Sequence, residues 1–243
     1  MKSRLDQLLV QRRIAVDLAT ARSLIGAGEV YVDERVQDKA GSLIQQTANI
    51  RLKARCPYVS RGGLKLQEGL TRFGIHCTGM VCVDIGASTG GFTDCLLQHG
   101  ARKVYAIDVA YGQFDWKLRQ DPRVVLMERF NARELTAAHI PESIDLAVLD
   151  ASFISLTKLI PPLIPLFKQD VALIALIKPQ FELSKDKIGP GGIVQEAQFH
   201  EEALESIRIF ALKHDLTVQG IVASPIRGRK GNKEYLISLI HSC

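Results

Sequence analysis

The chain has 243 residues and a formal net charge of +5 at pH 7, which suits one full domain with a small appendage. Its 47% hydrophobic and 23% charged residues exclude intrinsic disorder, a collagen-like repeat and a coiled coil. The longest uninterrupted apolar run, Val171–Ile177, falls far short of the ~20 residues that cross a bilayer. The sequence does not open on a basic-then-apolar stretch with a small-residue cleavage site, so we expect no secretory signal, and its five cysteines form no CxxC pair. We therefore expect a cytoplasmic protein without a metal site, a disulfide framework or a membrane partner.

Residues 1–58 are predicted to form a small basic domain. They carry ten Lys and Arg against six Asp and Glu, which leaves +1 for the rest of the chain. Helical spacing predicts a first helix around Leu5–Leu9, and a second that begins after the N-cap Asp17 and ends at Gly26. Charge alone fits a polyanion-binding appendage as well as a merely soluble basic surface. Short strands are expected at Val30–Val32, Arg35–Gln37 and Ile50–Leu52.

Residues 59–63 are expected to be a linker, because Pro57 stops a helix just before them, and residues 64–243 to form an α/β domain. Apolar strands alternating with amphipathic helices predict a doubly wound, Rossmann-like sheet. The last two strands are joined by a segment too short for a helical crossover, so the last strand should be antiparallel. The seven expected strands are Val81–Ile85, Val104–Val109, Val124–Met127, Ile144–Leu149, Val171–Ile177, Leu216–Ala223 and Tyr235–Ile240. Helices are expected at Gly63–Phe73, Gly91–Gln98, Ser155–Phe167 and Ala197–Lys213.

A glycine-rich loop follows the first strand of this sheet. Counting from Gly86, Ser88 occupies the second-glycine position of the dinucleotide fingerprint, where glycine lets the backbone approach a pyrophosphate. This replacement argues against NAD and favours S-adenosylmethionine, which has no phosphate. Asp84 fits the acid that faces the amino group of this cofactor, and Asp108 can accept from two ribose hydroxyls, unless it is only a strand-end turn residue. The cofactor-binding candidates are Asp84, Gly86, Ala87, Ser88, Gly90, Gly91, Phe92 and Asp108.

Charged residues stand where the predicted strands end. Asp150 and Lys178 each follow an apolar strand, and Glu234 precedes the last, reversed strand. Because the carboxyl ends of parallel strands line the ligand crevice of such a sheet, these three should lie together there. Lys65, on the preceding helix, can cap the crevice. A structural ion pair is the alternative for Lys178, and a solvated surface position for Glu234 and Lys65.

The basic domain resembles the small RNA-binding fold of ribosomal protein S-four. The resemblance implies a structured RNA partner, although a basic packing module is the alternative. The matching residues include Arg4–Asp6, Leu8–Val10, Ala21–Arg22, Leu24–Ile25 and Gly28–Val32. The arginines that would bind RNA are Arg4, Arg12, Arg13 and Arg22.

Lys65, Asp150, Lys178 and Glu234 reproduce, in order, the Lys–Asp–Lys–Glu tetrad of ribosomal RNA 2′-O-methyltransferases. With the strings around them, the chain is similar from end to end to the haemolysin-A (TlyA) family. Ala151 stands where that family more often has Val, a change that should not affect the chemistry. The strings are Tyr58–Gly63, Gly86–Asp94, Leu149–Leu156, Lys178–Glu182, Ser224–Ile226 and Gly231–Tyr235.

The resemblance implies a class I methyltransferase that uses S-adenosylmethionine and acts on ribosomal RNA or a ribosomal subunit. Its reaction would be in-line attack of a ribose 2′-oxygen on the methyl group, without a metal. Lys178 would be the base or a proton-steering cation, Asp150 would orient it, and Lys65 and Glu234 would position the substrate. By this resemblance a large-subunit target is favoured over specificity for both subunits, because the sequence lacks the extra residues at both ends of longer relatives. The other residues expected to bind RNA are Arg61, Arg227, Arg229 and Lys230.

Two other functions compete with this prediction. One is a non-catalytic RNA-binding or ribosome-assembly factor that retains the fold. The intact tetrad and the intact cofactor loop argue against this alternative. The other is a membrane-active haemolysin, as the family's name suggests, which no apolar segment of the sequence supports. The target nucleotide and the oligomeric state are not predicted.

Overall fold

The computed structural model describes residues 1–53, 56–167 and 171–241. The chain divides into two compact units, Met1–Arg55 and Cys56–Cys243. Residues 54 and 55, which fall in the predicted first domain, and the cysteine at position 243 lie outside the described residues. In the described part of the chain, no helix combines the length and the apolar character needed to span a membrane.

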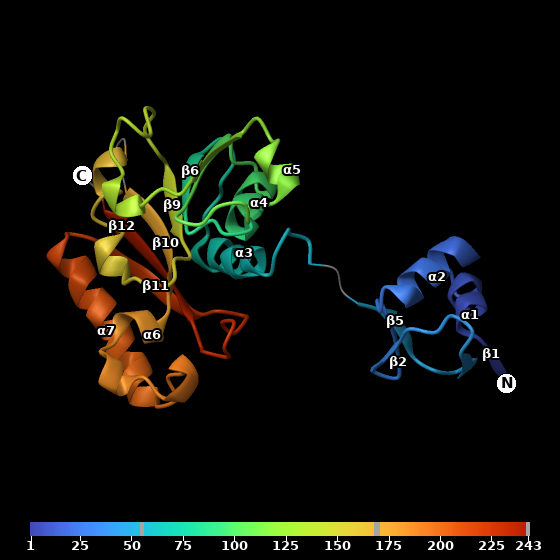
Figure 1. Ribbon diagram of the computed structural model, residues 1–243. Coiled ribbons are helices and arrows are strands. Elements are labelled where there is room, and N and C mark those ends of the chain that lie inside the picture. Colours follow the sequence, from blue (N-terminus) through green and yellow to red (C-terminus); the bar gives the residue numbers. More distant parts are fainter. Residues whose placement is uncertain (54–55, 168–170, 242–243) are drawn as a thin grey trace. The chain divides into compact units, whose positions relative to one another are not determined.

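The first unit packs two helices beside short antiparallel strands (Figure 1). α1 (Leu5–Gln11) and α2 (Leu18–Gly26) bury their apolar faces in a core that belongs to this unit alone. As predicted, the Asp17 side chain caps α2 by accepting a hydrogen bond from the Thr20 amide at 2.7 Å. The strands are β1 (Lys2–Arg4), β2 (Val30–Val32), β3 (Arg35–Gln37), β4 (Leu43–Gln45) and β5 (Ile50–Leu52).

The three predicted strands of the first unit, β2, β3 and β5, are confirmed and form one sheet with β2 in the middle. β1 and β4 were not predicted, and they pair with each other as a separate antiparallel ribbon. Each of these two strands is three residues long and mostly exposed, so no alternation of buried and exposed residues marks it in the sequence.

A seven-stranded sheet forms the centre of the second unit, in the order β11-β12-β10-β9-β6-β7-β8. Adjacent strands of this sheet are parallel, except that β12 runs antiparallel to both of its neighbours, β10 and β11. The prediction that the last strand is the reversed one is therefore confirmed. The strands are β6 (Val81–Ile85), β7 (Lys103–Asp108), β8 (Val124–Glu128), β9 (Leu146–Leu149), β10 (Val171–Ile177), β11 (Thr217–Ala223) and β12 (Tyr235–His241).

Both faces of this sheet are covered (Figure 1). α3 (Gly62–Phe73), α4 (Gly91–Gln98) and the short α5 (Trp116–Arg119) bury one face, and α7 (Ala197–Lys213) buries the other. Strands covered on both sides are apolar throughout, which is why their runs were recognisable in the sequence. α6 (Pro179–Glu182) follows β10 directly. The 3₁₀ helices are η1 (Ala132–Glu134), η2 (Leu156–Lys158), η3 (Ile164–Leu166), η4 (Lys185–Lys187) and η5 (Pro190–Gly192).

The predicted helix Ser155–Phe167 is wrong, because this segment contains η2 and η3 instead of one α-helix. Pro161, Pro162 and Pro165 lack amide hydrogens and clash with a preceding helical turn. The apolar pattern of the segment still predicted correctly that it packs on the sheet, since five of its residues lie in the core. The predicted strand at Ile144–Leu149 begins two residues later, at Leu146, and Ile144 forms an isolated bridge with Phe167.

Candidate active site

Four charged side chains meet at the carboxyl edge of the sheet. Asp150 follows β9, Lys178 follows β10, Glu234 precedes the reversed β12, and Lys65 comes from α3. Lys178 Nζ lies 2.6 Å from Asp150 Oδ1, and Lys65 Nζ lies 2.6 Å from Glu234 Oε2. Lys65 Nζ is also 4.0 Å from Asp150 Oδ2. The structure therefore brings the four predicted residues together as a continuous chain of alternating charge.

This charged chain is largely withdrawn from solvent. The side chains of Lys178 and Glu234 are 8% and 4% exposed, and that of Asp150, the most accessible, is 19% exposed. Charges at this depth need partners, and here two ammonium groups face two carboxylates. Lys178 Nζ also donates to Ser152 Oγ at 2.9 Å and to the Asp150 carbonyl oxygen at 3.3 Å. These acceptors fix the ammonium at the edge of the sheet.

The loop before β12 is shaped around Glu234. A Cβ at Gly228 would lie 2.3 Å from Glu234 Oε1, so a larger residue there would displace the carboxylate. Asn232, which is 3% exposed, ties this loop to the segment before α7. Its Oδ1 accepts from the Val194 amide at 2.9 Å and its Nδ2 donates to the Gly192 carbonyl at 2.7 Å. Glu234 is thus held by backbone shape as well as by its ion pair.

Asp84, the residue before the last of β6, has a fully buried carboxyl group. Its Oδ2 accepts a hydrogen bond from Thr93 Oγ1 at 2.7 Å, whereas its Oδ1 is buried with no partner among the described residues. Burial raises the pKa of Asp84 from its ordinary 3.8 to about 7, because the charged form is poorly solvated. A cationic donor reaching Oδ1 would satisfy this group.

Asp108 ends β7, and its carboxylate accepts hydrogen bonds from two backbone amides, one of them in the glycine-rich loop. Its Oδ2 accepts from the Ser88 amide and its Oδ1 from the Ala110 amide, both at 2.7 Å. Each carboxylate oxygen has a second lone pair and can accept one more hydrogen bond. The two backbone contacts therefore orient Asp108 and leave room for hydroxyl donors.

The other loop candidates are shaped by packing within the protein. A Cβ at Gly86 would lie 2.9 Å from the Asp150 carbonyl oxygen, and one at Gly90 would lie 2.4 Å from the Leu118 side chain. A Cβ at Gly91 would meet Ser60 Oγ at 2.2 Å. The absence of side chains here lets the loop pass close to its neighbours. Two further candidates, Ala87 and Phe92, have their side chains in the core.

Sequence reasoning missed Phe153, which directly follows Ser152 and lies three residues after Asp150. The side chain of Phe153 is 91% exposed, and its φ of +66° is in the left-handed region that bulky residues rarely adopt. Its ring lies 5.2 Å from that of Phe181 on α6. The contact with Phe181 does not explain why this ring is exposed or why its backbone is strained. Such strain often marks a functional position, and here it lies beside the charged site.

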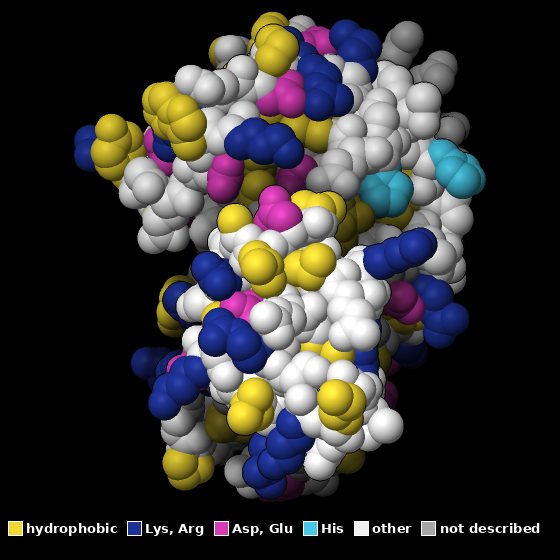
Figure 2. Space-filling model, turned by 90° about the vertical axis from the view of Figure 1, so that its right-hand side faces the viewer, with side chains coloured by type: hydrophobic (Ala, Val, Ile, Leu, Met, Phe, Trp, Pro, Cys, Tyr) yellow, Lys and Arg dark blue, Asp and Glu magenta, His cyan; other side chains and the backbone are white. Residues whose placement is uncertain are grey.

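Three of the basic residues predicted to bind RNA make contacts inside the first unit. In the first unit, Arg4 and Arg22 pair with the buried Asp6 at 2.8 and 3.1 Å, and Arg12 donates to backbone carbonyls at Gln46 and Ala48. These three arginines therefore help to hold the fold. The remaining candidates are exposed, and of these Arg227 donates to the Gly231 carbonyl oxygen at 3.1 Å; they are Arg13, Arg61, Arg227, Arg229 and Lys230. Figure 2 shows Lys and Arg side chains spread widely over the visible face, with fewer acidic groups among them.

The sheet order with its reversed β12 and the charged carboxyl edge define a Rossmann-like methyltransferase fold. Residues 58–241 match the family of FtsJ-like methyltransferases, and the chain belongs to that family. It is therefore a methyltransferase.

The chain is 41% identical to the 16S/23S rRNA (cytidine-2′-O)-methyltransferase TlyA of Mycobacterium tuberculosis, over 98% of this chain and 90% of the relative. It is 40% identical to Hemolysin A of Brachyspira hyodysenteriae, over 98% of this chain and 99% of that one. A solved structure named as a hemolysin from Streptococcus thermophilus has 40% identity and a TM-score of 0.77, covering 99% of this chain and 89% of that one. The resemblance to the haemolysin-A (TlyA) family is confirmed.

Proposed function

We propose that this methyltransferase transfers a methyl group from S-adenosylmethionine to a ribose 2′-hydroxyl of ribosomal RNA, with the large subunit as the favoured target. The observation that carries the proposal is the contact chain from Lys178 through Asp150 and Lys65 to Glu234. The relative from Mycobacterium tuberculosis is named for 2′-O-methylation of cytidine in ribosomal RNA, which supports the same reaction class here.

The residues of the cofactor loop fit S-adenosylmethionine. Asp84 Oδ1, which has no partner in residues 1–53, 56–167 and 171–241, suits its ammonium group, and the second lone pairs of the Asp108 oxygens suit two ribose hydroxyls. When bound, this cofactor supplies the methyl group as an electrophile. Ser88, with a φ of +50°, donates its amide to Asp108, so this amide does not point to a pyrophosphate, which agrees with a cofactor other than NAD.

The tetrad would prepare the hydroxyl for attack. Lys178 takes up or steers the proton of the ribose 2′-oxygen, and Asp150 and Ser152 fix its Nζ for that task. Lys65 and Glu234 position the ribose from the opposite side of Asp150. Because both pairs are preformed, the reacting atoms are aligned without rearranging the site, and alignment is a large part of such catalysis.

RNA binding would involve both units. We assign an S-four-like RNA-binding domain to residues 1–55 and the catalytic domain to residues 56–243, earlier than the expected boundary at 58 and linker at 59–63, because Tyr58 packs on Gly63 of α3. Two observations support this role for the first unit. It packs two helices beside antiparallel strands, and it has ten basic residues against six acidic ones. In the second unit, the exposed Phe153 ring would stack on a base turned out of its helix, and Arg227 and Arg229 would hold nearby phosphates.

Mapping of ribose methylation tests this function. Ribosomal RNA from cells that lack the gene is expected to lose a 2′-O-methyl stop in primer extension, and the purified protein with S-adenosylmethionine should restore it. Protein that binds the RNA but restores no methyl group would instead identify a non-catalytic ribosome-assembly factor.

Cofactor affinity should depend on pH through Asp84. Because its folded-state pKa of about 7 exceeds the ordinary value, the cofactor-free chain gains stability from this group at low pH and loses it as the pH rises toward 7. An ammonium on Oδ1 favours the carboxylate, so binding should release a proton, and affinity should increase from pH 5.5 to 7. Calorimetry in buffers of different ionisation enthalpy measures both effects. The Asp84→Asn variant should bind weakly with no pH dependence in this range; a wild-type affinity that is flat across it would contradict the role of Asp84.

A further inference from the structure

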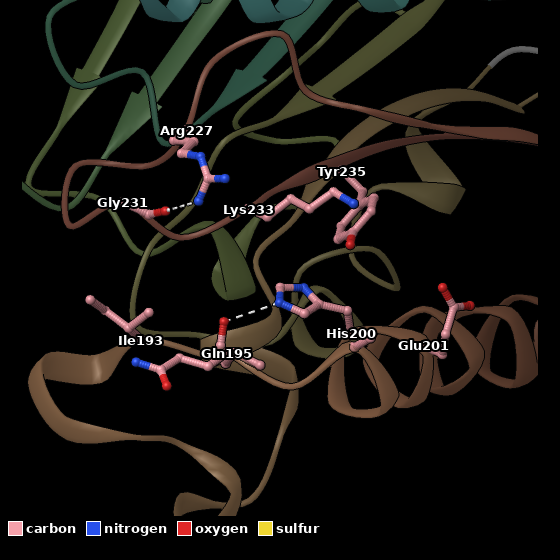
Figure 3. A pocket seen from close by; sticks show the side chains of 10 residues that line it. Ile193, Gln195, His200, Glu201, Arg227, Gly231, Lys233 and Tyr235 are labelled. Atoms are coloured by element: carbon pink, nitrogen blue, oxygen red, sulfur yellow. Dashed lines mark hydrogen bonds between the residues drawn. The ribbon is translucent and has the colours of Figure 1, made fainter.

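A pocket of about 410 Å³ (Figure 3) is lined by Tyr235, the residue that follows Glu234 of the tetrad. One wall is the segment from Ile193 into α7, and the other is the loop that leads into β12. Tyr235 lines the pocket, whereas the adjacent Glu234 turns to Lys65, because successive side chains of a strand face opposite sides. This cavity, here called the His200 pocket, is thus separate from the charged chain but shares its loop.

His200 contributes an unused acceptor to this pocket. His200 is only 8% exposed, and its Nε2 lies 3.1 Å from the Val194 carbonyl oxygen. A carbonyl only accepts, so Nε2 carries a hydrogen, and in the tautomer with its single hydrogen on Nε2 the other nitrogen, Nδ1, is an acceptor. Nδ1 is buried and has no partner among the described residues. Buried polar atoms are normally paired, so this nitrogen calls for an O–H or N–H donor from a ligand.

Two cations supply the complementary charge. Arg227 donates from Nη1 to the Gly231 carbonyl at 3.1 Å, which leaves its remaining N–H groups available, and Lys233 Nζ lies 5.1 Å from the centre of the Tyr235 ring. Figure 3 shows Arg227 and Gly231 on one side of the pocket and His200 with Tyr235 on the other. With Glu201 as the acidic lining residue, the walls keep a positive excess. An anion at the cations and a hydroxyl at His200 would satisfy both sides.

We propose that the His200 pocket binds a ribonucleotide of the substrate RNA that neighbours the target. Its phosphate contacts Arg227 and Lys233, and its ribose 2′-hydroxyl donates to His200 Nδ1, a group that distinguishes RNA from DNA. The choice of RNA as the ligand rests on the proposed function. Asn232 joins the two walls of the pocket, so a bound nucleotide also steadies the loop that holds Glu234.

Histidine-selective NMR of the full chain tests the pocket without any methyl transfer. Uridine 5′-monophosphate should shift the ring signals of His200, identified by their loss in the His200→Gln variant, and 2′-deoxyuridine 5′-monophosphate should shift them less. Glutamine keeps a donor near the position of Nε2 and lacks the Nδ1 acceptor, so the Val194 contact can persist. His200 signals that respond to neither nucleotide, or equally to both and to inorganic phosphate, would overturn the assignment.

Methylation kinetics then connect the pocket to the substrate. His200→Gln and Lys233→Gln should each raise the KM for ribosomal RNA about tenfold, the loss expected for one charged or buried hydrogen bond, with kcat and Tm near wild type. Lys213→Gln, which removes an exposed lysine at the end of α7, is the matched control and should change nothing. Unchanged KM in both pocket variants would refute the proposal. A wild-type chain that methylates no RNA would refute the proposed function instead, and the NMR result would stand apart.

Discussion

Replacement of Lys178 by alanine is expected to slow single-turnover methyl transfer by ~100-fold or more, while Tm and the affinity for S-adenosylmethionine stay near wild type. The substitution removes the ammonium that Asp150 and Ser152 hold at the sheet edge. Asp150 keeps Lys65 at 4.0 Å and is 19% exposed, so its carboxylate is not left isolated. Rapid-quench kinetics and thermal melting measure the two quantities. A loss of several kcal/mol in stability with an intact rate would show a purely structural ion pair.

Lys178→Arg separates the two chemical roles that remain. Arginine keeps the positive charge and does not give up its proton, so a base role requires this variant to be inactive. Substantial activity would assign Lys178 to positioning and to electrostatic steering of the proton. Lys158→Ala, at an exposed lysine of η2, is the matched control and should retain the full rate.

Deletion of residues 1–55 should abolish methylation of ribosomal RNA and leave the dissociation constant for S-adenosylmethionine within severalfold. The first unit has its own core, and the excess of basic residues in it provides phosphate contacts whose affinity falls as salt rises. Filter binding at several salt concentrations and calorimetry measure the two affinities. Methylation by the truncated chain at the wild-type rate would contradict the role of this unit.

The end point of that deletion matters because Tyr58 and Val59 belong to the second unit. Tyr58 is 7% exposed and packs so closely on α3 that a Cβ at Gly63 would lie 2.3 Å from its ring. The Val59 amide donates to Asp94 Oδ2 at 2.8 Å, at the start of α4. A deletion through Ser60 should therefore lower Tm and weaken cofactor binding, whereas the deletion through residue 55 should do neither.

Much of the fold could be predicted because its elements carry local signals. β10 is an apolar run and β6 is apolar apart from Asp84, and α7 shows the spacing of one buried helical face, so the ranges of these elements agree with the prediction. The segment 155–167 shows the limit of this reasoning. Its apolar spacing reported burial, but the backbone was decided by prolines that forbid the helical hydrogen bonds.

The sequence by itself determined which strands end in charged residues and which loop is rich in glycine, because burial patterns and turn residues are local. Only the tertiary structure decided which charges meet: Lys65 and Glu234 are 169 positions apart and pair because β12 returns antiparallel beside β10, under α3. The same holds for the exposed ring of Phe153 and for His200 Nδ1, which has no partner in the part of the chain that the structure describes; local patterns mark neither. Periodicity records which face of an element is buried, whereas contacts between side chains depend on which elements the chain places next to each other.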